Sequence, residues 1–247
     1  MMDFHCHLDL YPNAREVFAQ AVEKNAFTWL VTTSPRAFVA TSRVLGSHPK
    51  VCITPGMHPE IVHERHAELD LLLEQIEHAP AVGEVGLDGS RRFQHSYQAQ
   101  RRVFNAVVEQ CAKVGGRVLS IHSRQAVRDV LSILADHPGF GTAVLHWFSG
   151  SASELKAAAD QGCWFSIGPA AFNSASGKAL AKKLPHDRVV PESDGPFAQF
   201  NGATVMPWSA DETARLLAAL WEQPFDQIRH ALDSNSRRLL EVLQAYG

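Results

Sequence analysis

The chain has 247 residues, of which 45% are hydrophobic and 20% are charged, and its formal net charge is −3. This composition can form a large core and excludes an intrinsically disordered chain. The slightly acidic balance argues against the basic field typical of nucleic-acid-binding domains, and no apolar run approaches the roughly 20 residues of a membrane helix.

The first predicted element is a β-strand over residues 2–8, with the sequence MDFHCHL. Side chains two positions apart on a strand point to the same face, so His5 and His7 share one direction and the apolar residues between them share the other. Two neutral imidazoles side by side suit a divalent metal. The pair alone also fits two polar core histidines or a surface pair, so further ligands must come from the rest of the chain.

Short apolar runs continue along the chain and alternate with amphipathic stretches. The further predicted strands cover residues 27–33, 50–56, 79–87, 116–123, 141–148, 162–168 and 187–194. The predicted helices cover residues 13–24, 67–78, 97–113, 124–137, 152–161, 211–221 and 235–246. Several of the strands are apolar on both faces, as is typical of parallel strands buried under helices.

Eight strands alternating with helices predict an α/β fold of the (β/α)8 TIM-barrel type. The alternative is an open doubly wound sheet, but the chain lacks the glycine-rich fingerprint of dinucleotide-binding sheets. No linker divides the sequence, so we expect a single domain over residues 1–247. Residues 196–207, with glycine, proline and asparagine, are expected to form a long loop.

The four cysteines are scattered along the chain and form no C-x-x-C pair. We therefore expect buried thiols of a reducing compartment. No export signal fits, because the first predicted strand begins within three residues of Met1. These features favour a cytoplasmic location.

Acidic and imidazole side chains gather where the predicted strands end. These residues are His5, His7, His58, Glu84, His122, His146, Glu192 and Asp194. In a TIM barrel the carboxyl ends of the strands carry the active site, whereas structural polar residues would be scattered. The pattern therefore predicts a single site at one end of the barrel.

The donor types in this set point to divalent metals. Nitrogen and oxygen ligands suited to Zn²⁺, Mn²⁺ or another borderline ion come from His5, His7, Glu84, His122, His146 and Asp194. Six ligands exceed the needs of one open catalytic zinc, but they fit two metals that share a bridging carboxylate. Glu84, in the middle of the set, is the candidate bridge.

Six short motifs occur in order along the chain: DFHCHLD, GMHP, GEVGLD, IHSR, HWFSG and ESD. Together they resemble the TatD family of metal-dependent deoxyribonucleases, and the resemblance extends to NSRRLL at residues 235–240. The start, with DLYP after the histidines, also resembles the TatD-like subunit of Qat-type anti-phage defence systems. That second resemblance implies partner proteins.

The TatD resemblance implies two divalent metal ions, Zn²⁺, Mg²⁺ or Mn²⁺. It implies one metal held by His5, His7, Glu84 and Asp194, and a second held by Glu84, His122 and His146. It also implies catalytic roles for Asp194, Glu84, Glu192 and His58, with Asp194 orienting or deprotonating the attacking water. His58 and Arg124 are the expected substrate contacts, and the fork of an arginine suits a phosphate.

Three of these residues also have simpler interpretations. His58 could stiffen a proline-rich turn, Arg124 could cap or pair on the first turn of a helix, and Glu192 could be a structural acid. The loops depart from the family pattern at residues 89–92, 116–117 and 206–208, so the resemblance predicts the chemistry better than the substrate.

The function that the resemblance implies is a 3′–5′ exonuclease acting on DNA with frayed or single-stranded ends. Two alternatives remain open at this point. One is a metal-dependent ester hydrolase, such as a D-aminoacyl-tRNA deacylase. The other is a defence-complex subunit that is active only with its partners.

Overall fold

The structure, a computed structural model, describes residues 1–246, and its centre is a set of eight parallel strands. The strands are β1 (Met2–Cys6), β2 (Phe27–Val31), β3 (Val51–Thr54), β4 (Ala81–Gly86), β5 (Arg117–His122), β6 (Gly141–Leu145), β7 (Trp164–Ile167) and β8 (Val189–Pro191). All of them lie within the predicted strand ranges, and the predicted ranges extend beyond most of them at their carboxyl ends.

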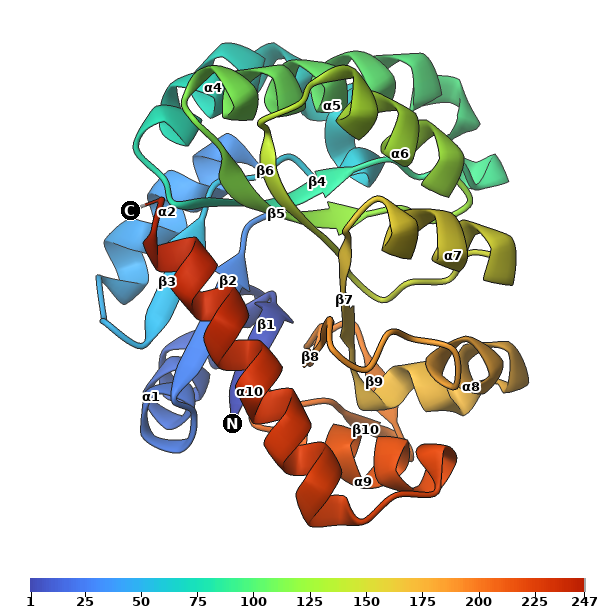
Figure 1. Ribbon diagram of the computed structural model, residues 1–247. Helices are drawn as coiled ribbons and strands as arrows, with labels where there is room; N and C mark the ends of the chain where they lie inside the picture. Colours follow the sequence, from blue (N-terminus) through green and yellow to red (C-terminus); the bar gives the residue numbers. More distant parts are fainter. Residues whose placement is uncertain (247) are drawn as a thin grey trace.

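Helices alternate with the strands and surround them (Figure 1). They are α1 (Ala14–Lys24), α2 (Pro35–Leu45), α3 (Val62–Arg65), α4 (Leu69–Glu77), α5 (Tyr97–Lys113), α6 (Val127–Asp136), α7 (Ala152–Asp160), α8 (Ala175–Ala181), α9 (Ala210–Trp221) and α10 (Phe225–Gln244). The largest apolar cluster lies between this ring and strands β4 to β8, and it includes Leu119, Ile121 and Phe165.

The strands form two parallel sheets, β1–β2–β3 and β4–β5–β6–β7–β8, which backbone hydrogen bonds join on both sides. On one side the amide of Gly83, on β4, donates to the carbonyl of Pro55, directly after β3, at 2.9 Å. On the other side the amide of Asp194 donates to the carbonyl of His5, at 2.9 Å. The eight strands therefore follow one another around a ring, and the predicted TIM-barrel type is confirmed.

Helix α10 closes the amino-terminal end of the barrel and crosses in front of the strands in Figure 1. Its Leu239 and Leu243 belong to one apolar cluster with Phe4, Trp29, Val118, Val144, Trp164 and Val190 from six strands. The helix begins ten residues before the predicted segment. Its first turns bury only a narrow stripe, Ile228 and Leu232, so the sequence pattern there is weak.

Three helices, α2, the four-residue α3 and α8, and one hairpin were not expected from the sequence. Helix α2 has local signals of its own, because the Ser34 side chain accepts from the amide of Ala37 and Pro35 occupies the first turn. Helix α8 is short. The expected loop over residues 196–207 contains an antiparallel pair, β9 (Gln199–Phe200) and β10 (Ala203–Thr204).

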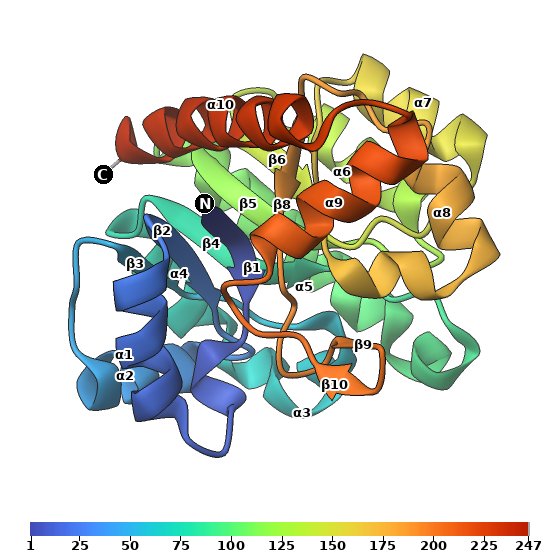
Figure 2. The same cartoon turned by 90° about the horizontal axis from the view of Figure 1, so that it is seen from below.

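Figure 2 shows this hairpin at the end of the barrel opposite α10. That end carries the carboxyl termini of the strands, where the polar motifs lie. In residues 1–246, no helix combines the length and apolar character that crossing a membrane requires.

Candidate metal centre

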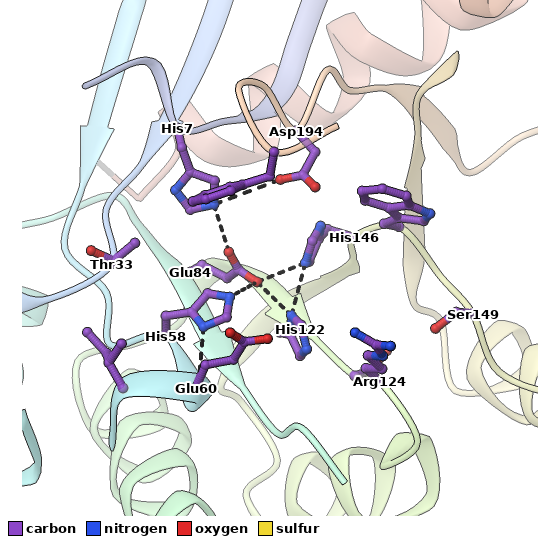
Figure 3. A pocket seen from close by; sticks show the side chains of 14 residues that line it. His7, Thr33, His58, Glu60, Glu84, His122, Arg124, His146, Ser149 and Asp194 are labelled. Atoms are coloured by element: carbon purple, nitrogen blue, oxygen red, sulfur yellow. Dashed lines mark hydrogen bonds and ion pairs between the residues drawn. The ribbon is translucent and has the colours of Figure 1, made fainter. Parts of the chain in front are cut away.

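Side chains expected to form the site converge on the carboxylate of Glu84, near the carboxyl end of β4, and Figure 3 shows His7, His58, His122 and His146 around it. Only 1% of the Glu84 surface is exposed. The backbone of the preceding β3–α3 connection lies against it, because a Cβ atom on Gly56 would be 2.4 Å from the Glu84 nitrogen. A glycine at position 56 is therefore required for Glu84 to occupy this position.

One oxygen of Glu84 faces the histidines of the first motif. His7 Nε2 lies 2.9 Å from Glu84 Oε2, and His5 Nε2 lies 3.4 Å from the same oxygen. The Asp194 carboxylate completes this group, because its Oδ1 is 3.4 Å from His5 Nε2. His7 lies one residue beyond β1 and remains beside His5, with the two ring centroids 5.1 Å apart.

The other oxygen of Glu84 faces three histidines from other strands. His146 Nε2, His122 Nδ1 and His58 Nε2 lie 2.8, 2.9 and 3.1 Å from Glu84 Oε1. The two carboxylate oxygens of Glu84 thus face two separate groups of side chains, each with candidate metal ligands. This is the arrangement that a bridging carboxylate requires.

The charges of this cluster are strongly coupled. Burial opposes ionisation of Glu84, but the surrounding His58, His146 and His122 outweigh it and hold the pKa of that carboxyl well below its usual value. Burial likewise opposes protonation of His5, yet hydrogen bonding to Asp194 and Glu84 raises the pKa of His5 well above its usual value. The site therefore holds carboxylates that attract a cation.

One ring nitrogen of His5 is placed where a metal ion could bind it. His5 Nδ1 lies 2.7 Å from Ser120 Oγ and can donate its hydrogen to the serine. The other ring nitrogen, Nε2, then faces the carboxylates of Glu84 and Asp194. Within residues 1–246, His5 Nε2 is buried and has no hydrogen-bond partner. The raised pKa of His5 means that a proton occupies Nε2 when no metal is bound, and a metal ion would take the place of that proton between Nε2 and the two carboxylates. A hydrogen bond to the far nitrogen, like the one to Ser120, is typical of metal-binding histidines.

His58 differs from the other histidines in its hydrogen bonding. Its Nδ1 accepts from the backbone amide of Glu60 at 3.2 Å, so Nε2 carries a proton, and this nitrogen lies 3.1 Å from Glu84 Oε1. A protonated nitrogen does not bind a metal. His58 is therefore arranged as a hydrogen-bond donor at the edge of the cluster.

Asp88 orients His122 from behind. His122 Nε2 lies 3.0 Å from Asp88 Oδ2, and the amide of Ser90 donates to Asp88 Oδ1 at 2.8 Å. Burial opposes ionisation of Asp88, but the hydrogen bonds from His122 and Ser90 hold its pKa at about 2. Asp88 therefore holds the ring of His122 against Glu84.

Glu192 lies on the far side of His146 from Glu84. It accepts from Ser166 Oγ at 2.6 Å and from the amide of Trp147 at 3.0 Å, while His146 Nδ1 is 3.8 Å away. Trp147 has a φ of +36°, a left-handed conformation that side-chain-bearing residues rarely adopt. Glu192 therefore lies beside His146 and outside the groups that face the two oxygens of Glu84.

The cluster forms the floor of a cavity of about 600 Å³. Arg124 lies on its wall, is exposed, and makes no ion pair with any residue in the described part of the chain. Wall residues that the sequence did not point to are Thr33, Glu60, Ile61, Ser123, Trp147, Ser149 and Phe197. Ser123, Trp147 and Ser149 lie within the motifs IHSR and HWFSG, and Glu60 directly follows GMHP, but no role was inferred for them from the sequence.

Comparison with known proteins places these features in a family. Residues 2–241 match the family described as TatD related DNase. A metal-dependent hydrolase TatD from Mycobacterium tuberculosis is 30% identical over 267 residues, covering 100% of this chain and 98% of the relative. A 3′-5′ ssDNA/RNA exonuclease TatD from Edwardsiella piscicida is 28% identical over 219 residues, covering 79% of this chain and 80% of the relative.

The fold also matches a solved structure. The crystal structure of the TatD homologue YJJV from Escherichia coli K12 superposes with a TM-score of 0.82 at 22% sequence identity. The match covers 96% of each chain. This likeness to an experimental structure supports the assignment of the fold as a barrel.

Proposed function

Because this chain belongs to the family of TatD-related DNases, we propose that it is a two-metal phosphodiesterase that removes nucleotides from the 3′ end of frayed or single-stranded DNA. The observation that carries the proposal is the division of the donors by Glu84. One carboxylate oxygen faces the first-motif histidines, and the other faces histidines from different strands. We take the direction of digestion, from the 3′ end, from the Edwardsiella relative, which is named a 3′-5′ exonuclease.

Each donor group would hold one divalent ion. The first group is His5, His7, Glu84 and Asp194, and the second is Glu84, His122 and His146. Two ions bound there would supply Lewis-acid stabilisation of the phosphate and a water molecule that ionises near neutral pH. This division is the one that the TatD resemblance implies.

The chain's own residues would position the reacting groups. Asp194 lines the cavity floor with its carboxylate held beside His5, where it can orient the attacking water and accept its proton. His58 carries a proton on Nε2 and also lines the cavity, so it can donate to a phosphate oxygen. Arg124, free of carboxylate partners in residues 1–246, can meet a phosphate with its guanidinium fork.

The shape and charge of the site favour a strand end over intact duplex. A cavity of about 600 Å³ is within the range that encloses a small ligand, and a terminal nucleotide is an object of that class. The formal net charge of −3 gives the protein no basic field to hold a long duplex. Binding would instead depend on the cavity itself.

The direct test is digestion of single-stranded DNA labelled at one end. Metal-stripped protein is resupplied with Mg²⁺, Mn²⁺ or Zn²⁺ and compared with Asp194→Asn and with Asp187→Asn, which changes an exposed aspartate outside the site. We expect metal-dependent release of the 3′ label by the wild type and by Asp187→Asn, with no release by Asp194→Asn.

Cleavage of carboxylic esters but of no phosphodiester would overturn the proposal in favour of a deacylase. Full activity of Asp194→Asn would contradict the proposed mechanism. If the isolated chain is inactive with every metal and gains activity only with partner proteins, the defence-complex hypothesis replaces it.

A further inference from the structure

Phe197 places an exposed aromatic ring on the wall of the cavity. Large hydrophobic side chains are exposed at only four positions in residues 1–246, and Phe197, at 60%, is the most exposed of them. The other three are Leu10, Val39 and Val44, which do not line the cavity. What sets Phe197 apart is its position, because an exposed aromatic ring on the wall of a cavity offers a face that a ligand in the cavity can cover.

The backbone around Phe197 is fixed at several points. The amide of Ala198 donates to the carbonyl of Asp194 at 2.9 Å, and the amide of Val205 donates to the carbonyl of Ala198 at 3.0 Å. Gly195 is closely covered, because a Cβ atom there would lie 1.7 Å from the Tyr11 hydroxyl oxygen. The ring is therefore presented by an anchored segment that begins at a candidate metal ligand.

The ring of Phe197 also contacts the candidate metal centre directly. It packs against His7 with centroids 5.1 Å apart and planes at 76°. The ring is thus held next to the group formed by His5, His7 and Glu84, and much of its surface stays open to the cavity. Arg124, the candidate phosphate contact, lines the same cavity.

From this arrangement we propose that Phe197 is a stacking platform for a base at the strand end, while the adjoining phosphodiester lies over Glu84. This inference rests on the proposed nuclease function and deepens it. Stacking on an aromatic ring tolerates every base, because each base has a π-face. The platform accepts only an unpaired base that has left its helix, so it selects frayed or single-stranded ends without reading sequence.

The test compares two oligonucleotides that differ only in the presence of bases at the 3′ end. One carries ordinary nucleotides, and the other carries tetrahydrofuran abasic residues at its last two positions. Each is digested by the wild type, Phe197→Ala, Phe197→Leu and Phe197→Tyr, with Val44→Ala as an exposed hydrophobic control away from the cavity.

On the ordinary end we expect Phe197→Ala to lower kcat/KM by roughly 5- to 100-fold, mainly through KM. Phe197→Leu should lose nearly as much, because it keeps the apolar bulk and lacks the aromatic face, and Phe197→Tyr should retain most activity. On the abasic end all four proteins should be similar. Val44→Ala should match the wild type on both substrates.

Equal activity of Phe197→Ala and the wild type on the ordinary end would overturn the inference. An equal loss on both ends would overturn it as well, because the base would then not be what Phe197 contacts. In either case digestion by the wild type and inactivity of Asp194→Asn would leave the proposed function standing. If the wild type digests neither oligonucleotide, both proposals fail.

Discussion

The imidazole rings of His5 and His146 are stacked, with centroids 3.9 Å apart and planes 5° from parallel. His5 lies on β1 and faces Oε2 of Glu84, whereas His146 follows β6 and faces Oε1. Two rings from the two proposed ligand groups are thus in contact.

The stack also constrains the charges of the two rings. Burial, together with the neighbouring His5, lowers the pKa of His146 to about 4. His146 is therefore neutral at physiological pH, as a metal ligand must be.

Glu84→Gln should affect both metals at once. The amide removes the shared negative charge and places N–H donors against imidazoles, so we expect loss of bound metal and a fall of more than roughly 100-fold in kcat. Metal content by mass spectrometry and digestion of labelled DNA are the measurements. Glu64→Gln, at an exposed glutamate of α3, is the matched control and should behave as the wild type. Retention of two ions by Glu84→Gln would exclude the bridging role.

Ser120→Ala should weaken the ligand group that contains His5. The serine holds His5 Nδ1 at 2.7 Å and so fixes which nitrogen faces the carboxylates. We expect metal affinity to fall roughly 10-fold while the fold is kept. A titration of metal-free protein with Zn²⁺ measures this, with the exposed Ser153→Ala as control. Unchanged affinity would mean that packing alone orients His5.

Asp3→Ala should lower the free energy of unfolding by roughly 3 kcal/mol. The buried Asp3 carboxylate accepts from the His5 amide, the Ser193 amide and the Ser193 hydroxyl, at 3.1, 3.0 and 2.6 Å. It thereby ties β1 to the segment after β8, and its removal leaves three buried donors without an acceptor. Urea unfolding measures the change, and Ser193→Ala should cost about 1 kcal/mol. A loss below 1 kcal/mol for Asp3→Ala would contradict this role.

The cysteines should not react with thiol reagents in the folded protein. Burial raises the pKa of Cys111 and of Cys163 to about 12, so at pH 8 only about one thiol in ten thousand is ionised. We expect little reaction with a disulfide reagent in native buffer and four reactive thiols in guanidinium. Rapid reaction of Cys111 or Cys163 in the native protein would show that the helices over them open readily.

The fold and the position of the candidate site could be predicted because both follow from one sequence pattern, apolar runs that end in polar residues. Ligand residues such as His122 and His146 end apolar runs, and parallel strands in a barrel present all their carboxyl ends on one side. The family match confirms the resemblance read from the six motifs. The resemblance to a defence-system subunit stays a prediction.

Features that depend on contacts between distant residues were not predictable. Asp3 and Ser193 are 190 positions apart, and Ser120 lies 115 positions from His5, so no local pattern reveals either pair. Phe197 lies in a segment expected to be a plain loop, and its exposure becomes visible only when the cavity has formed. Helix α8 is too short for its apolar period to stand out.

In the proposed mechanism one carboxylate, Glu84, holds two catalytic metal ions. The most direct test of this arrangement is the number of Mn²⁺ or Zn²⁺ ions bound per chain, measured by mass spectrometry as metal-free protein is reloaded while digestion of single-stranded DNA is followed in the same samples. We predict two ions per chain, with activity rising as the second ion binds. Full activity at one ion per chain, or with no metal bound, would contradict the account.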